Sequence, residues 1–366
     1  MFVKARNGKK TVLPFLKVIG IAVLSAMVLF FVVRAIGVRI NQAVPKGGIN
    51  EEAYVDINGT KQWISIYGQD MKNPVLLVLH GGPGWPESFS SYEYQKDWSD
   101  RYTVVTWDQR NCGLSYDPAQ NDTVITYDLM MEDGVQMTEY LMDYLGVEKI
   151  TLLGYSWGTY FGSNLVLNYP QYFDAYIGAG QLVDYYENEV AFKEQAYLWS
   201  AGDPEGTAMV DQFNPEHLTV SQMMLATEIM QRYGYATNSN GFGYSFAKAI
   251  IFNPYYSLSD YLLLLRYFQF HSSDDSMWLN FALSDEFDKF SLKGKTEYPI
   301  PVYYICGDSD YQTNYIQARE YFDLLEAPKK EFFLIPDCTH GLMEEKTDEF
   351  TAIMKTSNLL ILAISL

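Results

Sequence analysis

The sequence predicts an α/β fold: a mostly parallel central sheet flanked by helices, with a helical cap insertion and an N-terminal transmembrane helix. Three observations carry this prediction. Short apolar runs that end at glycine alternate with segments of helical periodicity, as in a parallel sheet wrapped by helices. Residues 181–295 lack such runs and are rich in tyrosine and phenylalanine. A long stretch without charge lies near the N-terminus.

The N-terminal stretch predicts a membrane anchor over residues 12–38. No charged residue lies between Lys17 and Arg34, and these two side chains can snorkel, so that the apolar flanks extend the span towards the roughly 20 residues a bilayer requires. The basic tail of residues 1–11 predicts a cytoplasmic N-terminus and an extracytoplasmic body. The alternative is a signal peptide cleaved before Ile36, although the apolar stretch is long for one.

The charge of the chain is unevenly distributed. The first 50 residues hold eight of the 26 basic residues and none of the 45 acidic ones. The remaining body is therefore strongly acidic, and phosphate backbones would be repelled from it. Nucleic acid is excluded as a partner on this ground, whereas the oligomeric state stays open.

The expected domains follow from the order of these segments. A linker over residues 39–50 leads to a core formed by residues 51–180 and 296–366, and the cap occupies residues 181–295. Alternating residues around Asn58-Gly59 predict a β-hairpin from strands 54–57 and 62–67. Apolar runs predict buried strands at 74–79, 102–107, 149–153, 175–179, 301–305 and 331–335, and a helix covers 130–145. The apolar end, residues 359–366, is expected to pack on the core.

Three cysteines give no metal-site pattern. The spacing of Cys112, Cys306 and Cys338 matches no zinc motif, and an odd number cannot all pair within the chain. A disulfide between Cys306 and Cys338 stays open because both lie near predicted strand ends. Three buried free thiols are the favoured interpretation.

The pentapeptide Gly154-Tyr155-Ser156-Trp157-Gly158 predicts a nucleophilic serine. It follows the predicted strand 149–153 and precedes a helix-like stretch, which is the setting of a nucleophile elbow. Its glycines are needed because the turn is too tight for side chains near the serine. An ordinary Ser/Gly turn is the alternative, but this strand-to-helix setting favours catalysis by Ser156.

A serine hydroxyl needs a base, and that base needs a carboxylate to orient it. His340 follows the last predicted strand and is the candidate base. Asp308 and Asp310 follow the preceding strand, and either one meets the requirement. The order Ser, Asp, His is the one expected for an elbow of this kind. The remaining histidines are assigned to a loop or to the cap: His80, His217 and His271.

The glycines after the strand 74–79 predict an oxyanion hole. In His80-Gly81-Gly82-Pro83-Gly84, backbone amides can approach a substrate because side chains are absent. We expect the amides of Gly82 and Trp157 to be the two donors. A plain strand-to-loop turn would explain the glycines but not their pairing with an elbow downstream.

These motifs resemble those of a known family. Together with Asp108-Gln109-Arg110-Asn111-Cys112-Gly113-Leu114-Ser115, the two glycine-rich segments resemble the signatures of proline iminopeptidases, serine hydrolases of the α/β-hydrolase fold. The resemblance covers about residues 50–180 and 296–348. It implies a triad of Ser156, Asp310 and His340, with Asp308 as runner-up, and no metal or organic cofactor. The family pattern has glycine at the position of Asn111. Asparagine is acceptable there because it tolerates left-handed backbone angles.

The cap departs further from the family. Proline iminopeptidases hold the free amino group of the substrate with cap glutamates in a Trp-x-x-Trp-Glu context that this sequence lacks. Glu187, Glu189 and Glu194 are the candidates for that role, and a solvated helix face is the alternative. The resemblance thus implies an aminopeptidase on small peptides. An esterase or lactonase on lipophilic acyl substrates and a catalytically silent binding protein are the alternatives.

Overall fold

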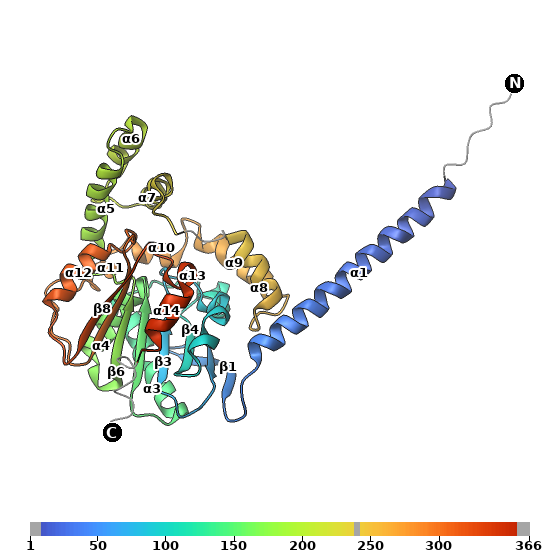
Figure 1. Cartoon of the computed structure of the whole chain (residues 1–366), viewed down its shortest axis with the longest axis horizontal. Helices are drawn as coiled ribbons and strands as arrows, with labels where there is room; N and C mark the ends of the chain where they lie inside the picture. The colour runs from blue at the N-terminus through green and yellow to red at the C-terminus, as the bar shows by residue number, and fades with distance from the viewer. Residues whose placement is uncertain (1–8, 238–241, 357–366) are drawn as a thin grey trace.

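The computed structural model describes residues 9–237 and 242–356, and its core is a mixed sheet. The sheet is eight-stranded, in the order β1-β2-β4-β3-β5-β6-β7-β8 (Figure 1). The first two strands pair antiparallel with each other, β2 also pairs antiparallel with β4, and every later pair is parallel. The predicted mostly parallel sheet is therefore confirmed. The strands are β1 (Ile49–Ile57), β2 (Thr60–Gly68), β3 (Val75–Leu79), β4 (Thr103–Asp108), β5 (Ile150–Tyr155), β6 (Phe173–Ala179), β7 (Val302–Gly307) and β8 (Lys330–Ile335).

The hairpin of β1 and β2 turns at the predicted residues. Asn58 and Gly59 have φ of 46° and 78°, the left-handed angles that a tight two-residue hairpin turn requires. The first strand begins earlier than predicted, inside the segment 39–50 that we expected to be a linker. It does so because Ile49 is buried and pairs with Gly68.

Helices cover both faces of the sheet. One apolar cluster joins Leu77 and Leu79 of β3 to α3 (Tyr127–Leu145), α4 (Trp157–Asn168) and α12 (Tyr315–Leu324). On the other face, Leu76 and Val78 pack with α2 (Gln95–Trp98), α13 (Leu342–Glu345) and α14 (Thr347–Met354). Alternate residues of β3 thus point to opposite apolar layers, which explains its unbroken apolar sequence.

The cap lies between β6 and β7 and, within the described residues, contains helices and no strand. Its helices are α5 (Tyr185–Trp199), α6 (Pro204–Gln212), α7 (Val220–Tyr233), α8 (Phe242–Phe252), α9 (Asp260–His271), α10 (Met277–Ala282) and α11 (Asp285–Asp288). The helices α5 to α7 share a small apolar cluster of their own, whereas α8 to α11 contribute to the large cluster of the core. The cap therefore consists of two differently attached parts.

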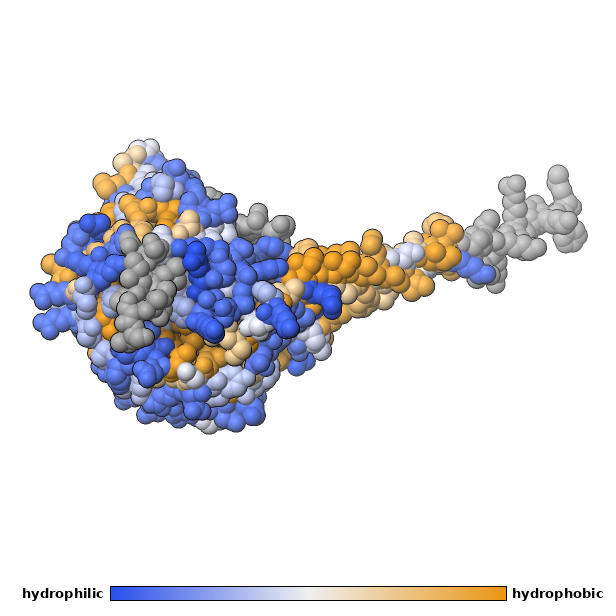
Figure 2. All heavy atoms as spheres, turned by 60° about the horizontal axis from the view of Figure 1, so that its bottom comes forward, coloured by the Kyte–Doolittle hydropathy of each residue, from blue (hydrophilic) through white to orange (hydrophobic). Residues whose placement is uncertain are grey.

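The N-terminal helix α1 (Lys9–Gln42) leaves the body as a single rod (Figure 1). From Phe15 to Gln42 it is long and apolar enough to cross a membrane, with a mean hydropathy of 2.6 in its most apolar window. Figure 2 shows it as a mostly hydrophobic rod beside a largely hydrophilic face of the body. Residues 1–8 of the predicted basic tail and the apolar residues 359–366 lie outside the described part of the chain.

Candidate active site

Ser156 lies at the junction of β5 and α4, in a strained turn. Its φ of 54° and ψ of −121° are unusual for any residue other than glycine. A Cβ atom on Gly154 would lie 2.3 Å from the carbonyl oxygen of Gly158, and one on Gly158 would lie 2.2 Å from that of Leu79. Both glycines are required for the turn to close against the neighbouring strand.

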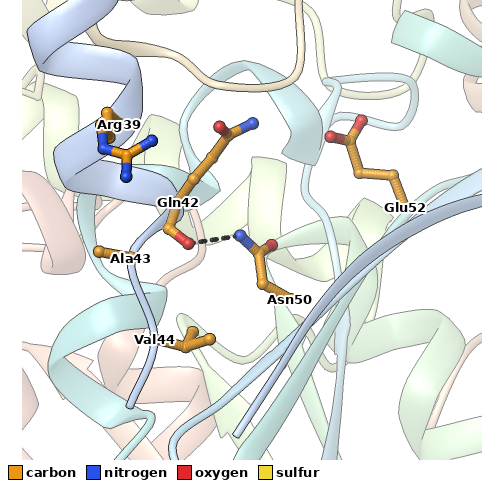
Figure 3. A pocket seen from close by; sticks show the side chains of 6 residues that line it. All are labelled: Arg39, Gln42, Ala43, Val44, Asn50 and Glu52. Atoms are coloured by element: carbon orange, nitrogen blue, oxygen red, sulfur yellow. Dashed lines mark hydrogen bonds between the residues drawn. The ribbon is translucent and has the colours of Figure 1, made fainter. Parts of the chain in front are cut away.

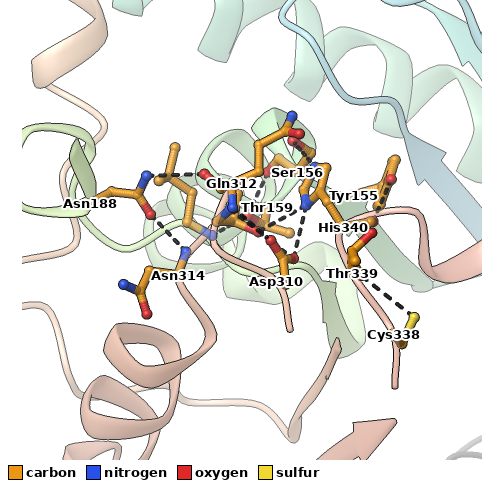
Figure 4. Close-up of polar contacts among 12 residues, drawn as sticks. Tyr155, Ser156, Thr159, Asn188, Asp310, Gln312, Asn314, Cys338, Thr339 and His340 are labelled. Atoms are coloured by element: carbon orange, nitrogen blue, oxygen red, sulfur yellow. Dashed lines mark hydrogen bonds and ion pairs between the residues drawn. The ribbon is translucent and has the colours of Figure 1, made fainter. Parts of the chain in front are cut away.

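The structure brings Ser156, His340 and Asp310 into one hydrogen-bonded line (Figure 4). His340 Nε2 lies 2.9 Å from Ser156 Oγ, and His340 Nδ1 lies 2.9 Å from Asp310 Oδ2. The three residues follow β5, β8 and β7, whose carboxyl ends meet at one edge of the sheet. All three side chains are buried.

Asp308 takes a different position from Asp310. Its carboxylate accepts hydrogen bonds from Ser309 Oγ and the amide of Cys338, at 3.1 and 3.4 Å. It thus joins the loops after β7 and β8, whereas Asp310 meets the imidazole. Of the two aspartates that the sequence left open, the geometry favours Asp310 as the partner of His340.

Thr313 supports the carboxylate, and we did not anticipate it from the sequence. Its amide donates to Asp310 Oδ1 at 2.9 Å, and its hydroxyl donates to Oδ2 at 2.9 Å while lying 3.2 Å from His340 Nδ1. A threonine three residues after an aspartate at a strand end is the signal that would have indicated this, because such side chains bond locally to turns.

His340 is also held from the elbow. The Tyr155 ring stacks on the imidazole at 5.2 Å between centroids, and its hydroxyl donates to the His340 carbonyl at 2.8 Å. Burial acts to lower the pKa of His340, but the charge and hydrogen bond of Asp310, with Glu344 and Glu345 nearby, raise it above its usual value. These contacts of Tyr155 were not predicted from the sequence.

The loop after β3 approaches Ser156 with its backbone. A Cβ atom on Gly81 would lie 3.2 Å from Ser156 Cβ, and Gly82 has a φ of 113° that favours glycine. Trp157 is the first residue of α4, so its amide is one of the donors that a helix leaves free. Trp157 thus follows the serine directly, and the loop that carries Gly82 approaches the serine through Gly81; the role of the two amides as oxyanion donors stays a prediction.

His80 holds this loop rather than serving as a base. Its Nδ1 bonds to the Gly81 carbonyl at 2.8 Å, and its Nε2 accepts from the Gln109 amide at 3.1 Å. Burial lowers the pKa of His80 to about 4, so the ring is neutral near pH 7. His271 lies on α9, stacked on Tyr267, and His217 lies between α6 and α7.

The segment from Asp108 to Ser115 is held to the residues that follow the glycine loop and to α3. The Asp108 carboxylate accepts from the amides of Ser88 and Leu114, at 2.8 and 2.7 Å. Arg110 forms a buried two-point ion pair with Asp133 at 2.6 and 2.7 Å. Asn111 has a φ of 50°, the left-handed conformation that we expected it to tolerate.

The three cap glutamates all lie on α5 but in different surroundings. Glu187 forms an ion pair with Lys293, and Glu194 is exposed. Glu189 is half-buried and accepts a hydrogen bond from the Asn188 side chain at 3.1 Å, and the loss of solvent around its carboxyl raises the pKa of that group to about 7. Asn188 also bonds to the Gln312 carbonyl and the Asn314 amide, at 3.0 and 2.8 Å, and thereby ties α5 to the Asp310 loop (Figure 4).

Three further features of the described residues bear on the chemistry of the protein. A cavity of about 640 Å³ lies between the end of α1 and β1, at the sheet edge, and Gln42 and Asn50 bond across it (Figure 3). Cys112, Cys306 and Cys338 are buried free thiols, so the disulfide is not formed. Among the described residues, no group of three His, Cys, Asp or Glu side chains is placed to hold a metal ion.

Comparisons with known proteins agree with this fold. A family model described as alpha/beta hydrolase fold matches residues 74–347. The probable aminopeptidase YbaC of Bacillus subtilis is 27% identical over 296 residues, which cover 78% of this chain and 89% of that protein. A proline iminopeptidase of Lactobacillus helveticus is 30% identical over 107 residues, 29% of this chain and 35% of that protein. The crystal structure of a proline iminopeptidase-related protein from Thermus thermophilus is similar in fold, with a TM-score of 0.57, 21% identity and coverage of 86% of this chain and 100% of that one.

Proposed function

Because this chain belongs to the α/β-hydrolase fold family, we propose that it is a serine hydrolase whose triad is Ser156, His340 and Asp310. The observation that carries the proposal is the unbroken line of hydrogen bonds from Ser156 Oγ through the imidazole to Asp310. A nucleophile, a base and an orienting carboxylate in this geometry are the parts that acyl transfer requires.

In this mechanism Ser156 Oγ attacks the substrate carbonyl while His340 Nε2 accepts its proton. The oxyanion accepts hydrogen bonds from the amides of Gly82 and Trp157, and one such donor is worth about 10² to 10³ in kcat. His340 then protonates the leaving amine, and the acyl-enzyme is hydrolysed by a water that His340 deprotonates. Asp310 holds the imidazole in the required tautomer and stabilises its charged form.

The activity we propose is removal of an N-terminal residue from small peptides. Its support is the similarity to a probable aminopeptidase over most of the chain. Such an enzyme must bind the ammonium group of its substrate within a partly apolar site, where an unpaired charge is costly. Glu189 is the candidate partner, because its carboxylate accepts a hydrogen bond from Asn188, the residue that ties α5 to the Asp310 loop, whereas Glu187 pairs with Lys293.

An esterase on a lipophilic acyl substrate is the second candidate. The observation that favours it is the aromatic surroundings of the elbow. The Trp157 ring contacts those of Phe281, Phe287 and Phe290, at 5.4, 5.1 and 5.0 Å between centroids. These rings give the surroundings of the elbow the apolar character that an apolar acyl group favours.

We also propose that α1 is an uncleaved single-pass anchor with a cytoplasmic N-terminus. Its length and hydropathy support a span, and the basic residues before it support the orientation. Arg34 and Asn41 of α1 donate hydrogen bonds to carbonyl groups of the cap. A helix with specific contacts to the folded body is better explained as a permanent part of the protein than as a removable signal.

Labelling with a fluorophosphonate tests the nucleophile. The purified full-length protein should be modified covalently at one residue, and Ser156→Ala should abolish labelling. Ser309→Ala is the matched control, because this serine lies in the neighbouring Asp310 loop and makes no hydrogen bond to His340. Labelling that survives in Ser156→Ala would refute the assignment.

Aminoacyl and acyl substrates then separate the two activities. An aminopeptidase should cleave aminoacyl-amides with a free amine and reject their N-acetyl forms. An esterase should prefer acyl esters and ignore the amine.

A further inference from the structure

The C-terminal part of α1 makes specific contacts with the cap. Arg34 donates hydrogen bonds to the carbonyl groups of Ile250 and Tyr256, and Asn41 donates to that of Phe252 at 2.8 Å. Ile250 and Phe252 lie in the last turn of α8, whose carbonyls a helix leaves unpaired and where a cation is favoured. A Cβ atom on Gly37 would lie 2.6 Å from the Phe252 ring, so this glycine permits close contact.

The contact between α1 and the end of α8 also fixes the position of the cap along the normal of a bilayer that α1 crosses. The part of α1 from Phe15 to Val33, in which Lys17 is the one charged residue and can snorkel, spans about 28 Å at a rise of about 1.5 Å per residue. That length matches a hydrocarbon core of about 30 Å. Arg34 is the first charged residue after it, so the boundary of the hydrocarbon falls at the level where the cap is attached. In Figure 1, α8 and α9 lie beside the base of α1, on the side towards which α1 extends.

Large apolar side chains are exposed at this place. Leu262 and Leu265 on α9 are 66% and 45% exposed; Leu258, in the connection from α8 to α9, and Phe252, at the end of α8, are 42% and 38% exposed. We call these four residues the α8–α9 face. Arg266 is exposed beside them and suits the anionic headgroups of a membrane surface.

We propose that the α8–α9 face lies in the interface of the same bilayer that α1 crosses, at the boundary between headgroups and acyl chains. The inference rests on the proposed membrane anchor. Lipid is the occupant because α1, through Arg34 and Gly37, holds this face at the edge of the hydrocarbon. Apolar side chains with a neighbouring cation are the composition of an interfacial contact.

This placement would bring the membrane close to the catalytic machinery. Phe268, on the same helix α9, lies 5.3 Å from the Trp85 ring and 6.1 Å from that of Phe89, measured between centroids. Trp85 directly follows the glycine loop that approaches Ser156. A lipophilic substrate dissolved in the bilayer would therefore meet the cap next to this loop.

Spin labelling of the full-length protein in vesicles of phosphatidylcholine and phosphatidylglycerol tests the proposal. Nitroxide is attached to single cysteines in Leu258→Cys and Leu262→Cys, and collision rates with oxygen and with a neutral nickel chelate are compared. Leu198→Cys on α5 and Met224→Cys on α7 are matched controls, since these positions are 70% and 68% exposed but belong to the other part of the cap. The native cysteines are buried, so the parent protein should remain unlabelled.

We expect collisions with oxygen to exceed those with the nickel chelate at positions 258 and 262, and the reverse at 198 and 224. Leu24→Cys within α1 reports on the anchor itself. If position 24 lies in lipid while 258 and 262 are as accessible to nickel as the controls, the α8–α9 face is not a membrane surface and the anchor stands. If position 24 is also accessible to nickel, both the anchor and the surface are refuted.

Discussion

At the residue scale, the hydrogen bond to the His340 imidazole separates Asp310 from Asp308, only two positions away. Both are aspartates in one loop, but only Asp310 bonds to the imidazole in the described contacts. We expect Asp310→Asn to lower kcat by about 10³ to 10⁴, because the imidazole would be held in the wrong tautomer. Asp308→Asn is the control and should leave kcat within a few-fold of the parent. Steady-state kinetics on one ester substrate check this, and the opposite ranking would make Asp308 the acid.

Glu189 is the residue on which the choice between peptidase and esterase depends. Glu189→Gln should raise KM for free-amine substrates and cost roughly 2 to 5 kcal/mol in kcat/KM, the range for removing one side of a buried charge pair. Hydrolysis of a neutral ester should change little. Glu194→Gln, on the exposed side of the same helix, should have no effect on either substrate. If Glu189→Gln and Glu194→Gln behave alike on free-amine substrates, Glu189 is not the ammonium partner.

We expect the titration of His340 to set the pH dependence of kcat/KM. The base must be neutral to accept the Ser156 proton, so kcat/KM should rise with pH through the pKa of His340 in the free enzyme. Because neighbouring carboxylates raise that pKa above 6.5, the rise should be centred above 6.5. Glu344→Gln removes one of these charges and should move the midpoint to lower pH, without lowering the plateau. A midpoint that does not move would show that the charge of Glu344 does not reach the imidazole.

At the element scale, the sequence was most informative where the physical constraint is local. A tight turn needs Asn58-Gly59 and a sharp elbow needs Gly154 and Gly158, and these residues lie where expected. A strand that is buried on both faces must be apolar, and the apolar runs of the sequence therefore located β3 and β5. The start of β1 was missed because Asn50 to Glu52 are polar and the strand is defined by its pairing with β2.

In the candidate site, too, some residues are recognisable from local sequence and others only from the folded structure. Ser156, His340 and the glycine loop are marked by their own neighbours in the sequence. Thr313 and Tyr155 are recognisable only once the loops after β5, β7 and β8 are brought together. The choice among the three α5 glutamates as partner of the substrate ammonium group also depends on tertiary burial. Their spacing in the sequence places them on adjacent turns and does not distinguish them.

The helix α1 carries a prediction of its own. Full-length protein should remain with the membrane fraction after carbonate or high-salt washing, since an apolar span is held by burial in lipid rather than by charge. Immunoblotting of the washed fractions measures this. Sequencing of the mature N-terminus is the control, and a chain that begins at Ile36 would show that α1 is a cleaved signal.

At the scale of the whole molecule, the two parts of the cap differ in how they depend on the core. The helices α8 to α11 complete the large apolar cluster of the sheet, and Asn253 donates to the carbonyls of Ser88 and Phe89 at 2.7 and 3.1 Å. This side chain joins the cap to the segment that follows the glycine loop. In contrast, α5 to α7 bury their apolar side chains mainly against one another.

The difference predicts unequal local stability. Amide hydrogen exchange in α5 to α7 should be faster than in α9 and α10, because opening the first group exposes only its own small cluster, whereas opening the second disrupts the core. Asn253→Ala should destabilise the core by about 1 to 3 kcal/mol, the cost of leaving buried backbone groups unpaired. It should therefore speed exchange in α9, α10 and the sheet together and leave the rates in α5 to α7 unchanged. Asn214→Ala, before α7, is the control and should spare the sheet. Uniform exchange across the cap would mean that the cap opens as one unit.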